Sequence, residues 1–296
     1  MLALPFRSLV RKVASCGPQW ASARCQVAAA ALPSARKAGL PAACALSTTS
    51  ADKPMFDEEV SRIYGVLAQQ HKHEHGPWKM MVGAVDEALP KTGGKVLDLA
   101  SGSGDPGIQI AVELPRSHVT ITDASPPQIE AALERSKGVA NTTCKVACMA
   151  DLGEFADESF DVVTSCYGYM FVEDKQKAFD ETFRVLKPGG TLVATYWRTL
   201  PFIPMVQQVV ETVTGAPPPD PPINPLALSA PGLVEGYLEA ARLELTRQQD
   251  STYPFEIGSD PDFAYKVGTL TIKAWKDELL AAGDMAGLER ARREWW

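Results

Sequence analysis

A glycine-rich segment between a predicted strand and a predicted helix carries the residues best suited to bind a ligand. It reads Val96-Leu97-Asp98-Leu99-Ala100-Ser101-Gly102-Ser103-Gly104-Asp105-Pro106-Gly107. Glycines let the backbone turn tightly and approach a ligand closely, and the helix start offers free N–H groups. The glycines fit a GxGxxG pattern, and Asp123 ends the next predicted strand, where it could hold a ribose. Taken alone, these features would also fit a dinucleotide site.

Three carboxylates near this loop favour a cationic ligand over a diphosphate. Asp98 ends the first strand, where it attracts an ammonium group and repels a pyrophosphate. Asp105 lies in the first turn of the helix, where a dinucleotide fold places phosphate oxygens. Asp151 follows the third strand, and its carboxylate can accept a hydrogen bond from an adenine amino group. A ligand with ammonium and sulfonium groups in place of the diphosphate accounts for all three.

A polar segment before the loop contains His71, His73 and His75. Histidine can take a proton near neutral pH, so these residues are candidates for a base or for a clamp on a second substrate. Alternation in an extended segment would place all three on one side, which leaves a metal site open beside a plain solvated bend. Four aromatic residues could also take part in binding: Tyr64, Trp78, Tyr167 and Tyr169. They could supply hydroxyl contacts or π faces toward a cation, or they could be core residues.

The elements that must position these residues alternate between apolar runs and helical stretches. We predict strands at 95–99, 118–122, 143–148, 160–165 and 191–196, and helices at 105–113, 126–136 and 175–186. Gly189-Gly190 is predicted to end the last helix. This alternation is typical of an α/β fold with a parallel sheet and helices on both faces.

Helical segments flank this core. We predict helices at 56–71 and 78–89 before it, and at 204–214 and 233–241 after it, with a Pro-rich loop at 216–225. Strands at 243–248 and 252–257 are expected to close the sheet as an antiparallel pair, and helices follow to the end. The chain is therefore divided into 1–50, a helical cap at 51–90, a cofactor-binding core at 91–200 and a substrate-side part at 201–296.

The first 50 residues differ in composition from the rest. They contain six basic residues and no acid, which is typical of a cleavable organellar transit peptide. Residues 6–13 could form a short amphipathic helix of the kind read by mitochondrial import; a plastid address and a disordered tail are the alternatives. Removal of this segment would lower the formal charge of −7 by six more units, which argues against nucleic acid as a partner.

Cysteine spacing gives no metal or redox motif, because no CxxC occurs. We expect Cys144, Cys148 and Cys166 to be reduced core residues, and we predict no metal. No apolar run reaches the roughly 18 residues that a membrane span requires.

Successive motifs resemble those of class I S-adenosylmethionine-dependent methyltransferases. The run 96–111 is followed by Thr122-Asp123-Ala124-Ser125, Met149-Ala150-Asp151, Phe160-Asp161-Val162-Val163 and Arg184-Val185-Leu186-Lys187-Pro188-Gly189-Gly190, in the family order. Tyr167-Gly168-Tyr169-Met170-Phe171 and Trp78-Lys79 are most similar to the branch of ubiquinone and menaquinone C-methyltransferases. Ala100 replaces the first glycine of the family. The resemblance covers residues 64–197 well and implies a mostly parallel, seven-stranded, Rossmann-like sheet with helical insertions.

The resemblance also implies a cofactor, S-adenosyl-L-methionine, and its contacts. Asp98, Ala100, Ser101 and Gly102 would face the methionine part, and Gly104 and Tyr64 are further residues expected to bind the cofactor. Asp123 would hold the ribose hydroxyls, Ala124 and Leu152 the adenine faces, and Asp151 the adenine amino group; Cys166 and Tyr167 would lie beside the methyl-bearing sulfur.

We therefore expect an enzyme that methylates a small-molecule acceptor, with His71, His73, His75 and Tyr167 as acceptor contacts or base. In-line methyl transfer mainly requires alignment and exclusion of water, so no obligatory catalytic motif can be sought. The alternative is a non-catalytic, cofactor-binding assembly factor of an organellar complex. A nicotinamide-dependent dehydrogenase is the third possibility.

Overall fold

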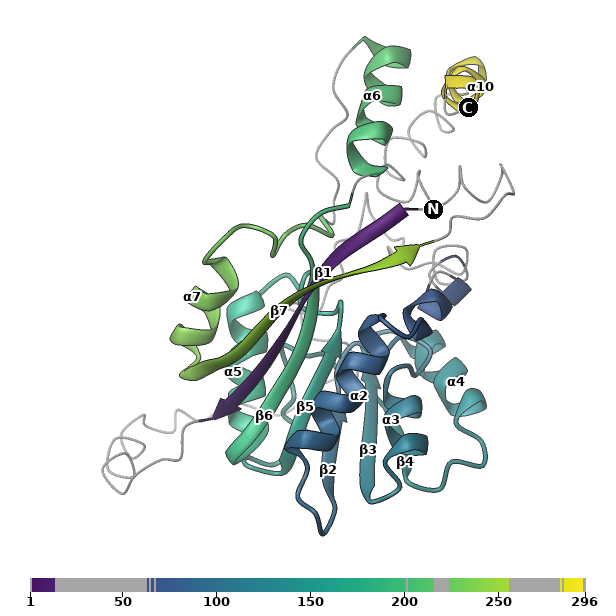
Figure 1. Ribbon diagram of the computed structural model, residues 1–296. Coiled ribbons are helices and arrows are strands. Elements are labelled where there is room, and N and C mark those ends of the chain that lie inside the picture. Colours follow the sequence, from purple (N-terminus) through teal and green to yellow (C-terminus); the bar gives the residue numbers. More distant parts are fainter. Residues whose placement is uncertain are drawn as a thin grey trace, which may run out of the picture.

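A seven-stranded sheet lies at the centre of the computed structural model, which describes residues 2–13, 63, 65–66, 68–200, 202–215, 224–255, 283 and 285–294. The strand order is β4-β3-β2-β5-β6-β1-β7 (Figure 1). The strands are β1 (Leu2–Val13), β2 (Gly94–Asp98), β3 (Ser117–Asp123), β4 (Thr142–Val146), β5 (Phe160–Cys166), β6 (Leu186–Trp197) and β7 (Leu243–Phe255). Strands β2 to β6 are parallel, and β1 runs antiparallel to both β6 and β7. The predicted mostly parallel sheet is confirmed.

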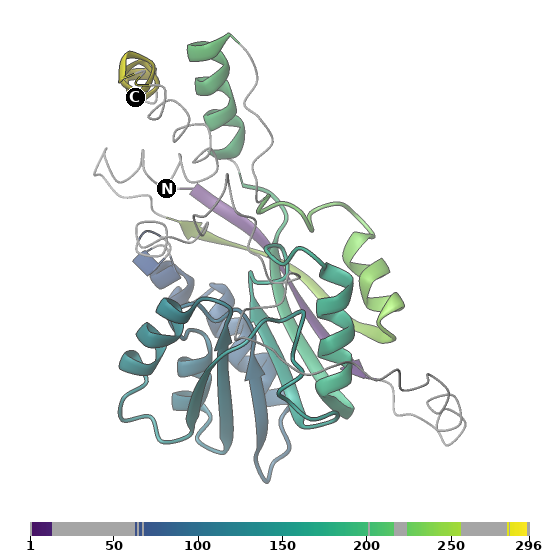
Figure 2. The ribbon, with the colours of Figure 1, turned by 180° about the vertical axis from the view of Figure 1, so that it is seen from behind.

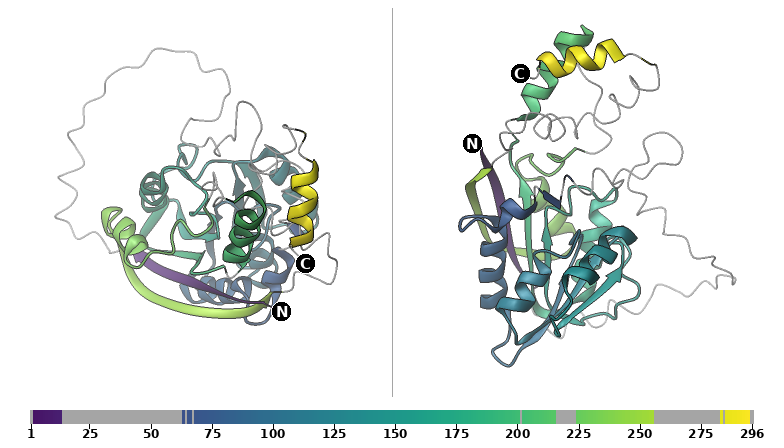
Figure 3. Two further views of the ribbon diagram at one scale, coloured as in Figure 1. Left: turned by 90° about the horizontal axis from the view of Figure 1, so that it is seen from above. Right: turned by 90° about the vertical axis from the view of Figure 1, so that its right-hand side faces the viewer.

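Helices cover both faces of the sheet. They are α2 (Pro77–Ala88), α3 (Gly107–Glu113), α4 (Pro126–Arg135), α5 (Lys175–Val185), α6 (Phe202–Thr214), α7 (Leu233–Ala240) and α10 (Met285–Glu294), with a 3₁₀ turn η2 (Gln69–Lys72) before α2. Figure 1 shows α2 and α3 in front of the sheet, and Figure 2, seen from behind, shows α5 on the opposite face. In Figure 3, α6 and α10 lie beyond the end of the sheet at which β6 leads into α6. This is the end at which the carboxyl termini of the parallel strands carry their loops.

Two apolar clusters follow from the alternation of side chains along the strands. Leu97 packs with α5 and α7 in one cluster, whereas its neighbour Val96 packs with α2, α3 and α4 in the other. Both residues have no exposed surface. A strand buried on both faces in this way is typical of a parallel sheet, and it fixes the strand end at Asp98 in place.

Local sequence explains where several helices begin. Asp174 caps α5 by accepting a hydrogen bond of 2.9 Å from the backbone N–H of Lys177. Pro77 and Pro126 stand in the first turns of α2 and α4, where a missing N–H costs nothing. The predicted core helices and strands are confirmed within a few residues.

The structure corrects two predictions about the later strands. β6 begins at Leu186, directly after α5, so Gly189-Gly190 lies inside a strand rather than at a helix end. The two short strands predicted at 243–248 and 252–257 are one strand, β7, which pairs with β1 along its length. Because β7 continues through Asp250, which the prediction placed in a turn, it reaches from α7 to the carboxyl end of the sheet.

The predicted amphipathic helix at residues 6–13 is wrong: this segment belongs to β1. Phe6 pairs with Trp197 of β6 and with Ser251 of β7, and the pairing continues to Lys12. β6 and β7 run parallel with one strand-width between them, so their facing backbone groups are satisfied by an antiparallel strand laid in that space. The interpretation of residues 1–50 as an organellar address rests on their composition, whereas cleavage of this segment would remove β1 from the sheet.

Two further findings concern the cysteines and the lengths of the helices. Cys144 and Cys166 are free thiols as predicted, but Cys148 is disulfide-bonded, so its prediction as a reduced cysteine is wrong. Within the described ranges, the helices are all too short or too polar to cross a bilayer.

Candidate active site

Asp98, at the end of β2, anchors the glycine loop from inside the protein. Its side chain has no exposed surface. One carboxylate oxygen accepts a 3.0 Å hydrogen bond from the backbone N–H of Gly107, and the other accepts one of 2.5 Å from the hydroxyl of Thr164 on β5. The sequence predicts that Asp98 attracts an ammonium group, and this stays a prediction. The structure shows that Asp98 ties the start of α3 to the sheet.

Burial makes the Asp98 carboxyl harder to ionise. Desolvation raises its pKa to about 6, although the hydrogen bonds from Thr164, Ser101 and Gly107 oppose this rise. A cation beside this carboxyl would favour its ionised form. The site therefore has a buried acid whose charge a positive ligand can stabilise.

Gly104 and Gly107 are needed for close packing of the loop. A Cβ on Gly107 would lie 2.8 Å from the Asp98 carboxylate and 2.9 Å from Ile121, and one on Gly104 would lie 2.6 Å from Ile108. Gly104 also has a φ of +108°, a conformation open mainly to glycine. The loop therefore lies as close to the sheet as its backbone allows.

Asp123, at the end of β3, holds the other side of the loop. Its two carboxylate oxygens accept hydrogen bonds of 2.9 Å from the backbone N–H groups of Gly102 and Ser125. Desolvation raises its pKa, and the hydrogen bonds from these N–H groups oppose that rise. A carboxylate has about four acceptor sites, so Asp123 can bind ribose hydroxyls as well. The backbone N–H of Ser101 donates to the carbonyl of Thr122, and the Ser101 hydroxyl donates to the carbonyl of Asp98. These two bonds place the loop between β2 and β3.

Asp105 is not the uncompensated anion that the sequence suggested. Arg135 of α4 forms an ion pair with its carboxylate and also donates hydrogen bonds to Ser103. The charge of Asp105 is therefore balanced within the protein. The argument against a diphosphate then rests on Asp98 rather than on Asp105.

Asp151 and Leu152 follow β4 in a short turn. The backbone N–H of Asp151 donates to the carbonyl of Cys148 at 2.9 Å, and Asp151 is half-buried. Leu152 is fully buried, and its backbone is fixed to α5 by hydrogen bonds with Glu181 and Arg184 of 2.7 and 2.8 Å. Ala124 is half-buried beside Asp123. These residues lie at the carboxyl edge next to β3, and their adenine contacts stay predictions.

Two residues other than glycine hold left-handed backbone conformations at this edge. Ala100 after β2 has a φ of 53°, and Tyr167 after β5 has a φ of 59°. The turns touch one another, because a Cβ on Gly168 would lie 2.8 Å from the Cβ of Ala100 and 2.4 Å from the Ser165 hydroxyl. Strained conformations of this kind cluster at ligand sites. The loop after β5 is thus fitted against the glycine loop.

Aromatic rings surround His71 next to these turns. Its ring centroid lies 5.1 Å from that of Tyr167, 5.9 Å from those of Trp78 and Tyr253, and 6.1 Å from that of Trp197. Tyr167 stacks on Trp197 with centroids 4.0 Å apart. His71 Nδ1 and the Tyr253 hydroxyl are 2.6 Å apart. We call these five residues the aromatic cluster.

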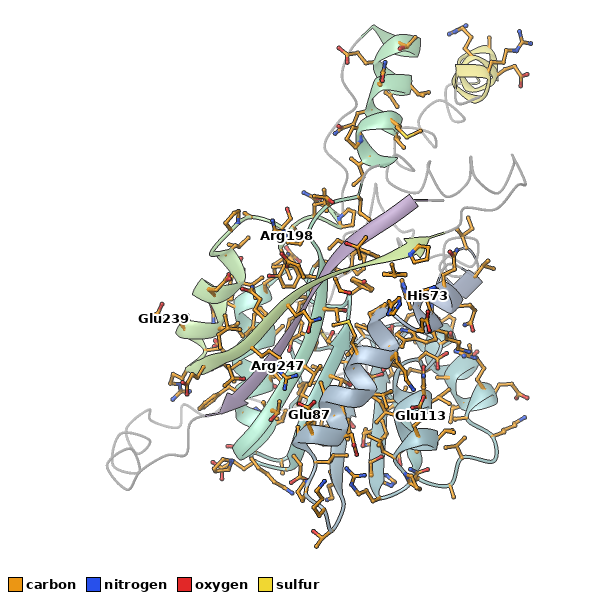
Figure 4. The ribbon with its side chains drawn as sticks, viewed as in Figure 1. His73, Glu87, Glu113, Arg198, Glu239 and Arg247 are labelled. Carbon is orange, nitrogen blue, oxygen red and sulfur yellow. The ribbon has the colours of Figure 1, made fainter. Side chains whose placement is uncertain are left out.

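The three predicted histidines do not lie together. His71 belongs to the turn η2 and is buried, whereas His73 and His75 lie in the bend that follows, and the His75 side chain is 68% exposed. Figure 4 shows His73 near the amino-terminal end of α2. His73 and His75 contact one another, with ring centroids 5.6 Å apart. The expectation that all three share a side is wrong, because the chain coils here instead of extending; within the described residues, no group of side chains is arranged to hold a metal.

Of the remaining candidate residues, Cys166 lies beside the aromatic cluster and Tyr169 does not. Burial raises the pKa of Cys166 to about 12, so its thiol stays protonated beside the cluster. Tyr169 points away from it: its hydroxyl lies 2.5 Å from that of Thr182 on α5, and its ring stacks on Phe179. Tyr64 lies outside the described residues.

Comparisons with known proteins identify the family to which this chain is similar. A model of the family described as "Methyltransferase domain" matches residues 90–236. A ubiquinone/menaquinone biosynthesis C-methyltransferase of Ruegeria sp. (strain TM1040) is 32% identical over 129 residues, which are 43% of this chain and 51% of that protein. A demethylmenaquinone methyltransferase of Thermus thermophilus is 36% identical over 110 residues, 37% of this chain and 50% of that protein. The chain belongs to the class I S-adenosylmethionine-dependent methyltransferases. Its cofactor is the S-adenosylmethionine of that family.

The chain spans about half the length of the curated relatives it matches. Among solved structures, a S-adenosylmethionine-dependent methyltransferase of Aquifex aeolicus is 17% identical, with a TM-score of 0.48 and coverage of 65% of this chain and 96% of that one. A phosphoethanolamine N-methyltransferase 2 of Haemonchus contortus is 28% identical, with a TM-score of 0.42 and coverage of 48% and 34%.

Sequence reasoning missed two members of the aromatic cluster. Trp197 lay just after the strand predicted at 191–196 and was given no role, and Tyr253 was placed in a closing strand without a role. Tyr253 also lies beyond the segment that the family model matches. An aromatic residue in a strand is most often a core residue, so no local pattern indicated that Tyr253 meets His71, which lies 182 positions earlier.

Proposed function

We propose that this chain transfers the methyl group of S-adenosylmethionine to a small-molecule acceptor. The observation that carries the proposal is the double anchoring of the glycine loop, by Asp98 from β2 and by Asp123 from β3. This geometry leaves carboxylates on both sides of a backbone that approaches its ligand closely. It suits a ligand with a cationic amino-acid part and a ribose.

The protein's contribution to transfer is alignment and exclusion of water. Displacement at a sulfonium methyl group is in-line, so the acceptor atom must lie opposite the departing sulfur. Cys166 is the last residue of β5 and Tyr167 follows it next to the glycine loop, and the aromatic cluster includes Tyr167. Tryptophan and tyrosine faces attract a sulfonium cation and provide a dry environment for the acceptor.

We assign the acceptor to the small-molecule class and not to nucleic acid. The chain carries a formal charge of −7 with 29 basic and 36 acidic residues, and polynucleotide binding requires clustered lysine and arginine. The relatives are named as C-methyltransferases of ubiquinone and menaquinone biosynthesis and as demethylmenaquinone methyltransferases. The specific form that we propose for this chain is methylation of a quinone precursor at carbon or oxygen. In this chain β7, which contributes Tyr253, lies outside the segment that matches the family model. The acceptor of this chain can therefore differ from the acceptors of the relatives.

A single-turnover assay tests the proposal. The purified chain is mixed with S-adenosylmethionine labelled in the methyl group and with a solvent extract of cells that lack the gene. A labelled small molecule in the organic phase is the expected result. Tight cofactor binding with no transferred label would instead support a non-catalytic assembly factor.

We further propose delivery to the mitochondrion, on the basic, acid-free composition of residues 1–50. A fluorescent fusion of the full chain should enter mitochondria, and one that lacks residues 1–50 should not. Plastid fluorescence would support the alternative address, and diffuse fluorescence of the full chain would refute both.

A further inference from the structure

An ion pair on α5 lies against the turn that follows β4. Glu181 and Arg184 are three positions apart on the helix, so their side chains share one face. The Nε and Nη2 groups of Arg184 donate to the two carboxylate oxygens of Glu181, each at 2.8 Å. This bidentate arrangement fixes the plane and the direction of the guanidinium group.

Both members of this pair bind the backbone of Leu152. The N–H of Leu152 donates to Glu181 Oε2 at 2.7 Å, and its carbonyl accepts a hydrogen bond of 2.8 Å from Arg184 Nη2. Leu152 has no exposed surface, so its N–H needs a partner within the protein, which Glu181 supplies. The ion pair therefore sets the orientation of the peptide groups on both sides of Leu152.

Arg184 also binds the far end of the turn. Its Nη1 donates to the carbonyl of Phe155 and to the carboxylate of Asp157, each at 2.8 Å. All five N–H donors of the guanidinium group therefore have a partner. A lysine has a single nitrogen and could not bind these groups at once.

Both side chains are charged at neutral pH. Burial alone would raise the pKa of Glu181, but the hydrogen bonds from Arg184 and Leu152 lower it below its usual value. Hydrogen bonds from a charged group are stronger than those between neutral groups. The turn is therefore held more firmly than a loop that is fixed by backbone hydrogen bonds alone.

The turn held in this way contains Asp151 and Leu152, the two residues predicted to contact the adenine. The N–H of Asp151 donates to the carbonyl of Cys148 at 2.9 Å, and its carboxylate accepts only a long bond of 3.4 Å from the N–H of Gly153 among the bonds of the described residues. Asp151 is half-buried. Its carboxylate therefore has acceptor sites left for a ligand.

We propose that Glu181 and Arg184 are positioning residues that set the selectivity of the cofactor site for adenine. They fix the backbone at Leu152, and through it the direction of the neighbouring Asp151 carboxylate that accepts the adenine amino group. A loosened turn would still allow the glycine loop to bind the rest of the cofactor, but the site would distinguish its base less well. This inference rests on the proposed function and deepens it.

Two ligands that differ at the base test the proposal. In S-inosylhomocysteine a carbonyl oxygen replaces the adenine amino group of S-adenosylhomocysteine, so an acceptor would face the Asp151 carboxylate. The wild type should prefer S-adenosylhomocysteine by about ten- to hundredfold in Kd, measured by calorimetry, the scale of one hydrogen bond to a charged group. In Arg184→Lys and Glu181→Ala this preference should fall to about threefold or less.

The ratio of the two Kd values separates positioning from folding. A variant that only lowers stability loses the same fraction of active protein for both ligands, so its ratio stays at the wild-type value. Glu181→Gln keeps an oxygen for the N–H of Leu152 and should retain more of the preference than Glu181→Ala. It is also the mildest of these changes, and it decides the question if Arg184→Lys does not fold.

Arg116→Lys is the matched control. Arg116 also donates to a backbone carbonyl and to a carboxylate, both of Asp86, at 3.1 and 2.5 Å, but it precedes β3 at the amino edge of the sheet. Its preference for S-adenosylhomocysteine should equal that of the wild type. An unchanged preference in the folded variants of Glu181 and Arg184, or an equal loss in Arg116→Lys, would overturn the inference.

Hydrogen exchange measured by mass spectrometry gives a second decision that needs no ligand. In Glu181→Ala the amides of residues 148–155 should exchange at least about tenfold faster than in the wild type, and those of β5 should change less. Equal acceleration in both segments would overturn the inference, as would a wild type that binds the two ligands equally. If the base preference and the exchange result hold but no label is transferred, the proposed function fails and the role of Glu181 and Arg184 in binding stands.

Discussion

The backbone N–H of Gly107 donates a 3.0 Å hydrogen bond to the buried carboxylate of Asp98, nine positions earlier in the chain. This bond closes the glycine loop against β2 and sets where α3 begins. Both residues are fully or nearly fully buried, so the loop and the strand end form one unit.

Gly107→Ala should disrupt this unit. The added Cβ would lie 2.8 Å from Asp98 and 2.9 Å from Ile121, so the loop must shift, at a cost of about 1–3 kcal/mol of stability. Cofactor affinity should fall with it, as measured by calorimetry with S-adenosylhomocysteine and by thermal unfolding. Gly83→Ala, an exposed helix position with nothing within 4 Å, is the control and should not weaken binding. Equal affinities in both variants would contradict the account of the loop.

Asp123→Ala should weaken S-adenosylhomocysteine binding by about 1–3 kcal/mol, the scale of charge-assisted hydrogen bonds. The substitution removes the predicted acceptor of the ribose hydroxyls and the contact with Gly102. Asp180→Ala removes an exposed carboxylate on α5 and should leave affinity unchanged. Unchanged affinity in Asp123→Ala would remove this residue from the site.

The raised pKa of Asp98, about 6, predicts pH-dependent binding. In the unliganded protein the neutral carboxyl is favoured, so the contribution of Asp98 to stability is full below about pH 4 and is lost as pH rises through about 6. A cationic cofactor favours the ionised form instead. Affinity for S-adenosylmethionine should therefore rise between pH 5 and 7.

Calorimetry in two buffers of different ionisation enthalpy checks the sign. Binding at pH 6 should release protons in the wild type and fewer in Asp98→Asn. Proton uptake, or equal release in the two proteins, would contradict the assignment of this ionisation to Asp98.

Residues 1–13 should matter for stability in the folded chain. β1 is the strand to which β7 is paired, and its removal leaves unpaired edges on β6 and β7. A chain that begins at residue 14 should unfold about 5 °C lower or more in a thermal scan, the shift expected for roughly 2 kcal/mol in a domain of this size. An unchanged Tm would mean that the folded core does without the segment, as a cleaved transit peptide would require.

The core of the fold could be predicted from sequence because its signals are local. Strand β2 and the glycine loop follow from an apolar run, an acid and glycines in one short stretch, and Asp123 from the end of the next run. The hydrogen bond between Gly107 and Asp98 depends only on the packing of α3 against β2, which are adjacent in the sequence. Parallel strands buried on both faces leave few other arrangements.

The rest of the site depends on contacts that no local pattern encodes. His71 could not be separated from His73 and His75, because the coiling of η2 depends on the burial of His71 against rings from distant strands. The pairing of Arg135 with Asp105 required the relative placement of α4 and the loop. The prediction for β1 was wrong because its apolar and basic residues fit a helical spacing, whereas its pairing with β6 and β7 depends on strands far away in the sequence.

The most direct test of the central claim is a crystal structure of the chain soaked with S-adenosylhomocysteine. We predict the ribose hydroxyls on the Asp123 carboxylate and the amino-acid part against the glycine loop between β2 and β3. An empty loop in crystals that diffract well, or a nicotinamide dinucleotide bound there in place of the nucleoside, would contradict it.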